Sequence, residues 1–166
     1  MPEVMGADSL FWCAQAVSAG ESLGADVIKQ KFPMPAKNLE AYRGALSKVE
    51  DKKGYYYSVM SEVEELLKLE PASLEEDSYE LQVKRLNFVA RCAPNSLKII
   101  SGGPKTKDSE TLLTNLKAVM DSGNEGQIVG RNLWGRPIEE SIDIAEQMNG
   151  LMKMPEYKRE LKYTKP

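Results

Sequence analysis

The chain has 166 residues, of which 42% are hydrophobic and 28% charged, and this balance predicts one compact globular domain. Its formal net charge of −3 argues against a dedicated nucleic-acid-binding protein, which normally carries a strong basic excess. The sequence contains no histidine, which excludes Ser-His-Asp and Cys-His nucleophile pairs and removes the commonest zinc ligand, so any catalysis must use lysine, carboxylate, tyrosine or backbone dipoles.

Targeting signals are not recognisable in the sequence. No apolar run approaches the roughly 20 residues that a membrane helix needs, and residues 1–16 lack a basic stretch followed by an apolar one. We therefore expect a cytoplasmic protein with no membrane or nucleic-acid partner. Cys13 and Cys92 lack metal-ligand spacing and are expected to be free thiols packed as small hydrophobic side chains. The basic residues of 153–166 are interpreted as a solvated C-terminal tail.

The first half of the chain predicts a helix, a strand and a long helical region. Residues 10–23 are rich in alanine and end at Gly24, which suits a helix closed by a left-handed glycine. Residues 25–32 have the pattern of a strand stopped by Pro33. Apolar residues then keep helical spacing as far as residue 93, and residues 36–71 are interpreted as a helical insertion.

The second half predicts two strands, each followed by a helix. Residues 97–100 form a short apolar strand that runs into Ser101-Gly102-Gly103, and a helix capped by Asp108 or Ser109 follows and ends at Gly123. Residues 127–129 form a third strand before Gly130 and Arg131, and Pro137 is expected at the first position of a helix over 138–152. The apolar stripe expected on that last helix consists of Ile138, Ile142, Ala145, Met148 and Met152.

Strands that alternate with helices predict an α/β fold with a parallel sheet and right-handed crossovers. Function in such sheets lies at the carboxyl ends of the strands, and the segments 24–32, 101–105 and 129–132 lie at such ends. A complete TIM (β/α)₈ barrel takes roughly 250 residues, and this chain supplies only three clear strands. We therefore expect a partial barrel whose remaining strands are missing or supplied by another chain.

Lys29 and Lys31 are the candidate reactive groups of the first strand. Side chains two residues apart share one face of a strand, so these lysines and Val27 are expected to point the same way. Burial in the mouth of a barrel would desolvate an amine and make it nucleophilic. The alternative for such a pair is that the lysines extend to solvent at the strand end.

The Ser101-Gly102-Gly103 segment is a candidate phosphate loop. Glycine lets backbone amides approach a phosphate, and the following helix adds a favourable dipole. A plain turn is the alternative for this segment alone. Gly130-Arg131-Asn132 repeats the arrangement one strand later, and the phosphate site of TIM barrels is often built by the loops after the last two strands. Arg131 would supply a bidentate, permanently charged partner.

Taken together, residues 24–33, 99–107 and 126–134 resemble the class I fructose-1,6-bisphosphate aldolases of the archaeal and bacterial type, a (β/α)₈-barrel family. Residues 81–92, with Arg85, Val89, Ala90 and Cys92, resemble the longer bacterial branch before its penultimate strand. The resemblance implies that this chain holds roughly the last three βα units and that Lys29 forms the Schiff base. It further implies that a substrate phosphate is held by Ser101, Gly102, Gly103, Gly130 and Arg131, and that no metal or cofactor is used.

The resemblance covers only the end of the family pattern. A family member would place about five strands before residue 25, with an aspartate and a tyrosine that transfer protons. We therefore expect this chain to be inactive alone and to associate as a homo-oligomer or with the missing barrel portion. Alternatives are a related aldolase acting on another phosphorylated ketose, or a non-catalytic remnant or interaction protein that keeps the phosphate-binding third of the barrel.

Overall fold

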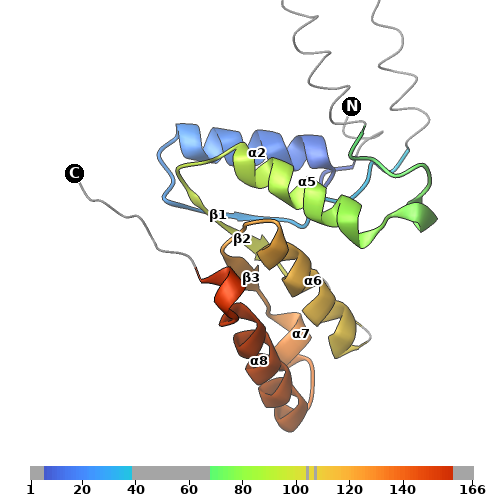
Figure 1. Ribbon diagram of the computed structural model, residues 1–166, viewed down its shortest axis with the longest axis vertical. Coiled ribbons are helices and arrows are strands. Elements are labelled where there is room, and N and C mark those ends of the chain that lie inside the picture. The colour runs from blue at the N-terminus through green and yellow to red at the C-terminus, as the bar shows by residue number, and fades with distance from the viewer. Residues whose placement is uncertain (1–5, 39–67, 104, 107, 159–166) are drawn as a thin grey trace, which may run out of the picture.

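The computed structural model describes residues 6–38, 68–103, 105–106 and 108–158. The helices and strands of these residues follow one another in alternation (Figure 1). They are α2 (Leu10–Ser22), β1 (Val27–Gln30), α5 (Tyr79–Arg91), β2 (Leu97–Ser101), α6 (Ser109–Asp121), β3 (Gly126–Ile128), α7 (Arg131–Trp134) and α8 (Ile138–Met152), with two short 3₁₀ helices, Leu74–Glu76 and Pro155–Tyr157. The helices expected between residues 39 and 67 lie outside the described residues.

Local sequence signals set most of the helix ends. The expected helix at 10–23 is α2, and Gly24 follows it with φ +84°, a backbone conformation that favours glycine. The side chain of Asp108 caps α6 by accepting a hydrogen bond from the Thr111 N–H at 2.7 Å, and Gly123 beyond the other end has φ +89°. These features confirm the helix boundaries that the sequence predicts.

The three strands form one parallel sheet in the order β1-β2-β3. This confirms the predicted parallel α/β arrangement. Ile28 and Ile100 are buried and face the helices, whereas Val27 and Lys29 alternate with Ile28 and are exposed. Because α2 packs on α5, α5 on α6 and α6 on α8, the helices succeed one another along one face of the sheet (Figure 1).

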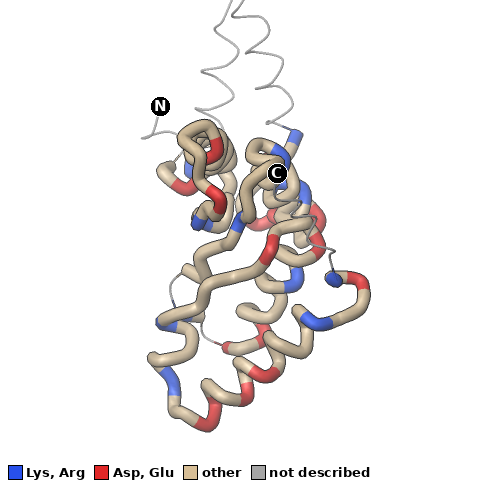
Figure 2. The backbone as a smooth tube through the Cα atoms, turned by 90° about the vertical axis from the view of Figure 1, so that its left-hand side faces the viewer, with Lys and Arg blue, Asp and Glu red and all other residues tan. Residues whose placement is uncertain are grey.

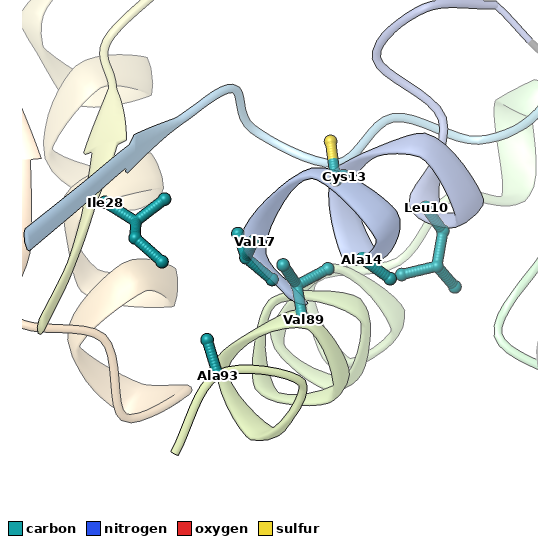
Figure 3. Packing of buried hydrophobic residues seen from close by; sticks show 7 residues of the cluster. All are labelled: Leu10, Cys13, Ala14, Val17, Ile28, Val89 and Ala93. Atoms are coloured by element: carbon teal, nitrogen blue, oxygen red, sulfur yellow. The ribbon is translucent and has the colours of Figure 1, made fainter. Parts of the chain in front are cut away.

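The apolar core lies between this helical layer and the covered face of the sheet. Figure 3 shows the cluster in which Val17 of α2 meets Val89 of α5 and Ile28 of β1. A second cluster joins Ile100 of β2 to α5 and α6, and a third joins α6 to α8. Cys13 belongs to the first cluster, and neither Cys13 nor Cys92 forms a disulfide, as the sequence predicts.

Helix α8 buries a different stripe from the one expected. Pro137 is its N-cap rather than its first helical residue, and its buried residues are Ile144 and Met148. Of the expected stripe only Met148 is buried, while Ile138 is 75% and Ile142 54% exposed. Among the described elements, α8 packs mainly on α6 and α7, and this packing leaves Ile138 and Ile142 exposed.

Bonds of the Arg85 side chain hold together the residues before and after the segment 39–67. The Arg85 side chain is fully buried and bonds both carboxylate oxygens of Asp77, at 2.6 and 2.7 Å. The same guanidinium donates to the carbonyls of Pro33 and Leu69. Near them the Ala36 N–H donates to a carboxylate oxygen of Glu70 at 2.9 Å. The segment therefore leaves and rejoins the fold at neighbouring points.

Candidate functional site

The carboxyl ends of all three strands meet at one edge of the sheet, because the strands are parallel. The loops that leave this edge are residues 31–36, 102–108 and 129–137. They contain or adjoin every residue that the sequence analysis assigns to the site. Figure 1 shows the short helix α7 and the start of α8 following β3 at this edge.

Lys29 lies on β1 and points to the face of the sheet that the helices leave open. Val27 shares that face with Lys29, as predicted. Both side chains are exposed, so the described residues do not supply the desolvation that the sequence argument invokes. That desolvation would have to come from whatever covers the open face.

The strand register relates Lys29 to the phosphate loop. Lys29 pairs with Ile99, and Ser101 lies two residues further along β2, so the two side chains stand on the same face. With strands about 4.8 Å apart and a rise of about 3.3 Å per residue, their Cα atoms are about 8 Å apart. A lysine side chain can span much of that distance. The sheet therefore brings Lys29 and Ser101 close together.

The two positions after Ser101 favour glycine for different structural reasons. A Cβ on Gly102 would lie 2.9 Å from the Ile128 carbonyl oxygen and 3.0 Å from Val129 Cγ1, so only glycine fits there. Gly103 has φ +69° and is exposed. The Gly102 N–H donates to the Ile128 carbonyl at 2.8 Å, which extends the pairing of β2 with β3. The Gly102 N–H is therefore used within the sheet and does not point to an anion.

The loop after β3 brings Arg131 close to the loop after β2. Gly130 is the N-cap of α7, and a Cβ there would lie 3.0 Å from Trp134 Nε1. Arg131 is exposed, and its Nη2 donates to the carbonyl of Gly103 across 3.4 Å. Residues predicted from two separate motifs therefore meet in space.

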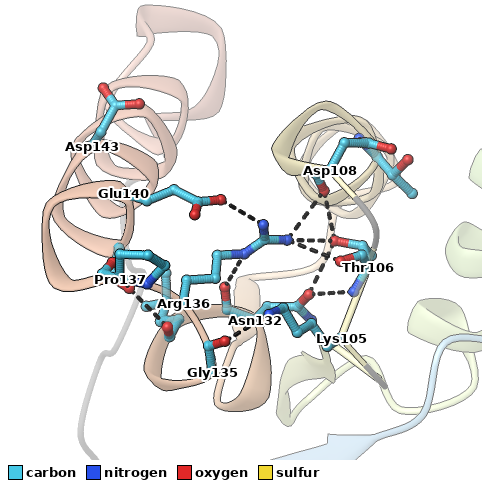
Figure 4. A network of polar contacts seen from close by, with 12 residues as sticks. Lys105, Thr106, Asp108, Asn132, Gly135, Arg136, Pro137, Glu140 and Asp143 are labelled. Carbon is cyan, nitrogen blue, oxygen red and sulfur yellow. Dashed lines mark hydrogen bonds and ion pairs between the residues drawn. The ribbon is translucent and has the colours of Figure 1, made fainter.

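Asn132 joins these two loops through a buried side chain, as Figure 4 shows. Its Oδ1 accepts from the Thr106 N–H at 2.8 Å and from the Thr106 hydroxyl at 3.1 Å, and its Nδ2 donates to the Gly102 carbonyl at 3.1 Å. Sequence reasoning quoted Asn132 within its motif but gave it no role. Its position in the same strand-to-helix turn as Arg131 was the signal that could have found it.

Arg136 adds a second layer to the same network. Its Nε donates to the Asn132 carbonyl at 2.9 Å and its Nη2 to the Thr106 carbonyl at 3.0 Å. Glu140 of α8 pairs with its Nη1 at 2.6 Å (Figure 4). Lys105 Nζ donates to the Gly135 carbonyl at 2.6 Å. No sequence pattern identifies Arg136, Thr106 or Lys105, because their contacts exist only in the folded chain.

A cleft of about 270 Å³ lies behind the first loop. Its lining includes Ser101, Gly102, Gly103, Lys105, Thr106 and Gln127. Gln127 pairs in register with Ile100, which faces the helices, so the cleft opens on the helical side of the sheet. Neither Lys29 nor Arg131 lines it.

Two other groups with nucleophilic atoms, the Cys13 thiol and the Lys98 amine, are buried within the fold. Burial raises the pKa of the Cys13 thiol to about 11, so this thiol is protonated at neutral pH. The Lys98 amine is buried on the helical side and donates to the carbonyls of Ala93 and Ser96 at 2.9 and 2.6 Å. Neither group reaches the open face.

On the outer side of the helical layer, the Asp121 carboxylate is a hydrogen-bond acceptor for three side chains. Lys117 Nζ and the Tyr79 hydroxyl each lie 2.5 Å from its Oδ2, and the Tyr157 hydroxyl donates to its Oδ1. Burial and the bond to Asp121 raise the pKa of Tyr79 to about 12. This cluster fastens α5, α6 and the short helix at 155–157, and it lies apart from the strand-end loops.

Metal ligands do not gather in the described part of the chain. Within the described ranges, no three Cys, Asp or Glu side chains are placed to hold a metal ion. Among the helices that the structure describes, none is both long and apolar enough to cross a membrane. Acidic residues recur along α8, with basic residues elsewhere on the chain (Figure 2).

The sequence matches one family of aldolases over most of its length. The profile of the DeoC/LacD family aldolases aligns with residues 12–136, a span that contains Lys29, Ser101 and Arg131. A class 1 fructose-bisphosphate aldolase from Thermoproteus tenax is 33% identical over 75 residues. That alignment covers 44% of this chain and 28% of the relative, so the match spans less than a third of the relative's length.

Solved structures with a similar fold include two fructose-1,6-bisphosphate aldolases. One is an archaeal enzyme with its catalytic lysine covalently bound to the carbinolamine intermediate of the substrate; it has a TM-score of 0.56 and 20% identity. The other is a Schiff-base-forming enzyme with a TM-score of 0.56 and 21% identity. Each superposition covers 89% of this chain but only 39% and 40% of the other chain. The likeness therefore concerns the fold of less than half of these aldolases.

Proposed function

Because the chain belongs to the DeoC/LacD family of aldolases, we propose that it is the lysine-bearing and phosphate-binding portion of a class I fructose-1,6-bisphosphate aldolase. One observation carries this proposal. The open face of the sheet presents Lys29 about 8 Å from Ser101, at the edge where Arg131 meets Gly103. An amine and an anion-binding loop at that spacing suit a phosphorylated ketone of a few carbons.

In the proposed reaction the neutral amine of Lys29 attacks the ketone carbon of fructose 1,6-bisphosphate. The carbinolamine loses water and becomes an iminium ion. The electrons of the C3–C4 bond then flow into the iminium as the C4 hydroxyl gives up its proton, which releases glyceraldehyde 3-phosphate. The enamine that remains on Lys29 takes up a proton at C3 and becomes an iminium ion again, and its hydrolysis frees dihydroxyacetone phosphate and restores Lys29. These products belong to glycolysis and gluconeogenesis, which implies a cytoplasmic setting.

The phosphate of the substrate would be held by the two loops at the strand ends. Ser101 and Gly103 provide a hydroxyl and a left-handed turn, and the Arg131 guanidinium supplies a permanent positive charge. Gly102 and Gly130 contribute by leaving room, since a Cβ at either position would crowd a neighbouring atom. No step of the proposed mechanism uses a metal or a cofactor.

We further propose that the sheet is part of a TIM barrel. Parallel sheets are normally covered on both faces, and in a barrel the second face is the packed interior. Here the described residues cover one face only, leaving Val27 51% and Ile128 43% exposed on the other. The remaining strands would cover this face, bury Lys29 and supply the proton-transfer groups. Association with that missing barrel portion, or with further copies of the chain, would complete the enclosure.

The proposed division of the domain treats residues 36–71 as an insertion in the barrel and 153–166 as a tail. The bond between Ala36 and Glu70 supports the first point, because it joins the ends of the segment. In the tail, the Tyr157 hydroxyl donates to Asp121, so the described part of the tail is anchored to α6.

Borohydride trapping tests the catalytic proposal. Incubation with dihydroxyacetone phosphate and borohydride should leave a reduced adduct on Lys29 in any assembly that has aldolase activity. Lys31→Arg is the matched control, because Lys31 lies on the same segment and the adduct should persist in that variant. A label on Lys31, or none in an active preparation, contradicts the assignment.

The exposure of Lys29 also suits a second candidate, a non-catalytic protein that keeps only the phosphate-binding part of the fold. Such a protein would bind phosphate esters but form no adduct in any assembly. A related aldolase for another phosphorylated ketose would form the adduct with dihydroxyacetone phosphate yet fail to cleave fructose 1,6-bisphosphate. The trapping and cleavage assays together separate these possibilities.

A further inference from the structure

The side chain of Asn132 occupies a position that only a primary amide satisfies. It is fully buried, and its oxygen accepts two bonds from Thr106 while its nitrogen donates to the Gly102 carbonyl. A carboxylate would set an oxygen against the Gly102 carbonyl, and an apolar side chain would leave the buried Thr106 N–H without its acceptor. The burial of this side chain, its donating nitrogen and its accepting oxygen therefore all specify asparagine.

Both partners of Asn132 belong to the loop after β2, whereas Asn132 itself belongs to the turn after β3. Gly102 belongs to the predicted phosphate loop, Ser101-Gly102-Gly103, and Thr106 follows that loop. A single side chain thus holds the backbone on both sides of Gly103. Its neighbour Arg131 is at the same time directed to the Gly103 carbonyl.

Arg136 holds Asn132 from the opposite side. The guanidinium bonds the backbone carbonyl of Asn132 and that of Thr106, and its ion pair with Glu140 fixes it to α8. Helix α8 packs on α6, which begins directly after the same loop. The two loops, α6 and α8 are therefore linked in one closed arrangement (Figure 4).

We infer that Asn132 is a positioning residue that sets the distance between Gly103 and Arg131, and that the phosphate half-site is already formed in this chain before any further barrel strands are added. The inference rests on the proposed function, because it concerns the same two loops. Asn132 is itself buried beneath the loops and acts on the anion through their geometry.

The test measures phosphate binding by the 166-residue chain and its variants with titration calorimetry and phosphorus NMR. The probes are inorganic phosphate and dihydroxyacetone phosphate, with dihydroxyacetone as the non-phosphorylated control. Asn132→Leu keeps the shape of the side chain and removes its polar bonds. We expect it to weaken binding of both phosphates at least about tenfold, the scale of lost hydrogen bonds to a charged ligand.

Three controls separate positioning from general stability. Asp121→Asn disturbs the polar cluster on the outer helical surface and should leave phosphate affinity within about twofold of the wild type, because it lies apart from the loops. Thr106→Ser keeps both bonds to Asn132 and should also leave the affinity unchanged. Hydrogen exchange of the Thr106 amide should be faster in Asn132→Leu and normal in Asp121→Asn.

The results distinguish failure of the inference from failure of the proposed function. Wild-type affinity in Asn132→Leu, or equal losses in Asn132→Leu and Asp121→Asn, overturns the positioning role. A wild-type chain that binds neither phosphate overturns the preformed half-site, while the trapping of Lys29 in an active assembly still decides the proposed function. If Asn132→Leu does not fold, Thr106→Val removes the hydroxyl bond to Asn132, together with the hydroxyl contacts to Asp108 and Arg136, and keeps the bond from the Thr106 N–H. It should give a smaller loss of affinity, and no loss in that variant overturns the inference.

Discussion

The two faces of the three-stranded sheet are built from similar residues but have opposite surroundings. On the covered face Ile28 and Ile100 are buried against α2, α5 and α6. On the open face Val27 and Ile128 are about half exposed, and Lys29 stands between them in the register. The difference teaches that the covered face is complete within the described chain, whereas no described element covers the open face.

The same comparison explains where stability and chemistry reside. Burial of apolar surface stabilises the covered face, at roughly 25 cal/mol for each Å² removed from water. The open face keeps the Lys29 amine and its apolar side chains exposed. The loops at the strand ends connect the two environments, because the Gly102 N–H extends the sheet while Arg131 lies exposed beside Gly103. Changes on each side should therefore affect different measurements.

The largest expected effect is on the covered face. Ile100→Ala should lower the free energy of unfolding by about 2–5 kcal/mol, because it leaves a cavity among Leu86, Ala118 and Val119. The matched change Ile128→Ala on the open face should cost less than about 1 kcal/mol in the isolated chain. Urea denaturation of both variants, at a protein concentration low enough to keep the chain monomeric, measures the contrast. Equal losses in the monomer would show that Ile128 is packed as closely as Ile100.

At the strand ends, Arg131→Ala should weaken binding of a phosphate ester by about 1.5–3 kcal/mol, the scale of a hydrogen bond to a charged group. Binding of the corresponding non-phosphorylated ketone should change little. Calorimetric titration with dihydroxyacetone phosphate and dihydroxyacetone gives both values. Similar losses for the two ligands would assign Arg131 a structural role.

A negative charge introduced on the open face should weaken the association of the chain with further copies of itself. We expect the chain to be an oligomer in solution, and Ile128→Glu should raise the concentration at which it associates by at least about tenfold, because a buried unpaired carboxylate is costly. Ile138→Glu, on the exposed stripe of α8, tests whether that helix contributes to the same contact. Size-exclusion chromatography with light scattering follows both. A wild-type chain that stays monomeric and cleaves fructose 1,6-bisphosphate would contradict the partial-barrel proposal.

The smallest effect concerns the outer side of the helical layer. Burial tends to raise the pKa of Asp121, but hydrogen bonds from Lys117, Tyr157 and Tyr79 outweigh it and hold the pKa below the usual 3.8. A depressed pKa in the folded state gives stability that is present above about pH 4 and lost as the pH falls through the folded-state value. Melting curves should therefore show a smaller acid-induced loss for Asp121→Asn than for the wild type. An identical acid profile would mean that this carboxylate contributes little.

Sequence periodicity predicted much of the local structure. The helices at 10–22, 79–91 and 109–121 and all three strands follow from apolar spacing, from glycine at positive φ and from the Asp108 cap. The predicted apolar stripe of α8 was wrong. One set of apolar residues with helical spacing includes Ile138 and Ile142, another includes Ile144 and Met148, and only the contact with α6 selects the second set. Periodicity reports that a helix has an apolar face, but packing decides which face is used.

The candidate site divides in the same way. Lys29, Ser101, Gly102, Gly103, Gly130 and Arg131 were predicted from residue types at strand ends, and the parallel sheet brings those ends to one edge. The assignment of these residues to catalysis and phosphate binding remains a prediction. Thr106 and Arg136 were missed because no local pattern records their bonds. Thr106 donates to the side chain of Asn132, 26 residues away, and Arg136 donates to the carbonyl of Thr106, 30 residues away.

By itself, the sequence determined the alternation of strands and helices, the glycines that its turns require and the resemblance to class I aldolases, because each depends on residues close together in the chain. Only the tertiary structure decided that no described element covers one face of the sheet, that Gly102 donates its N–H to Ile128, and that Asn132 joins two loops. These features arise from contacts between distant segments, and their free energies depend on distance, burial and direction in space.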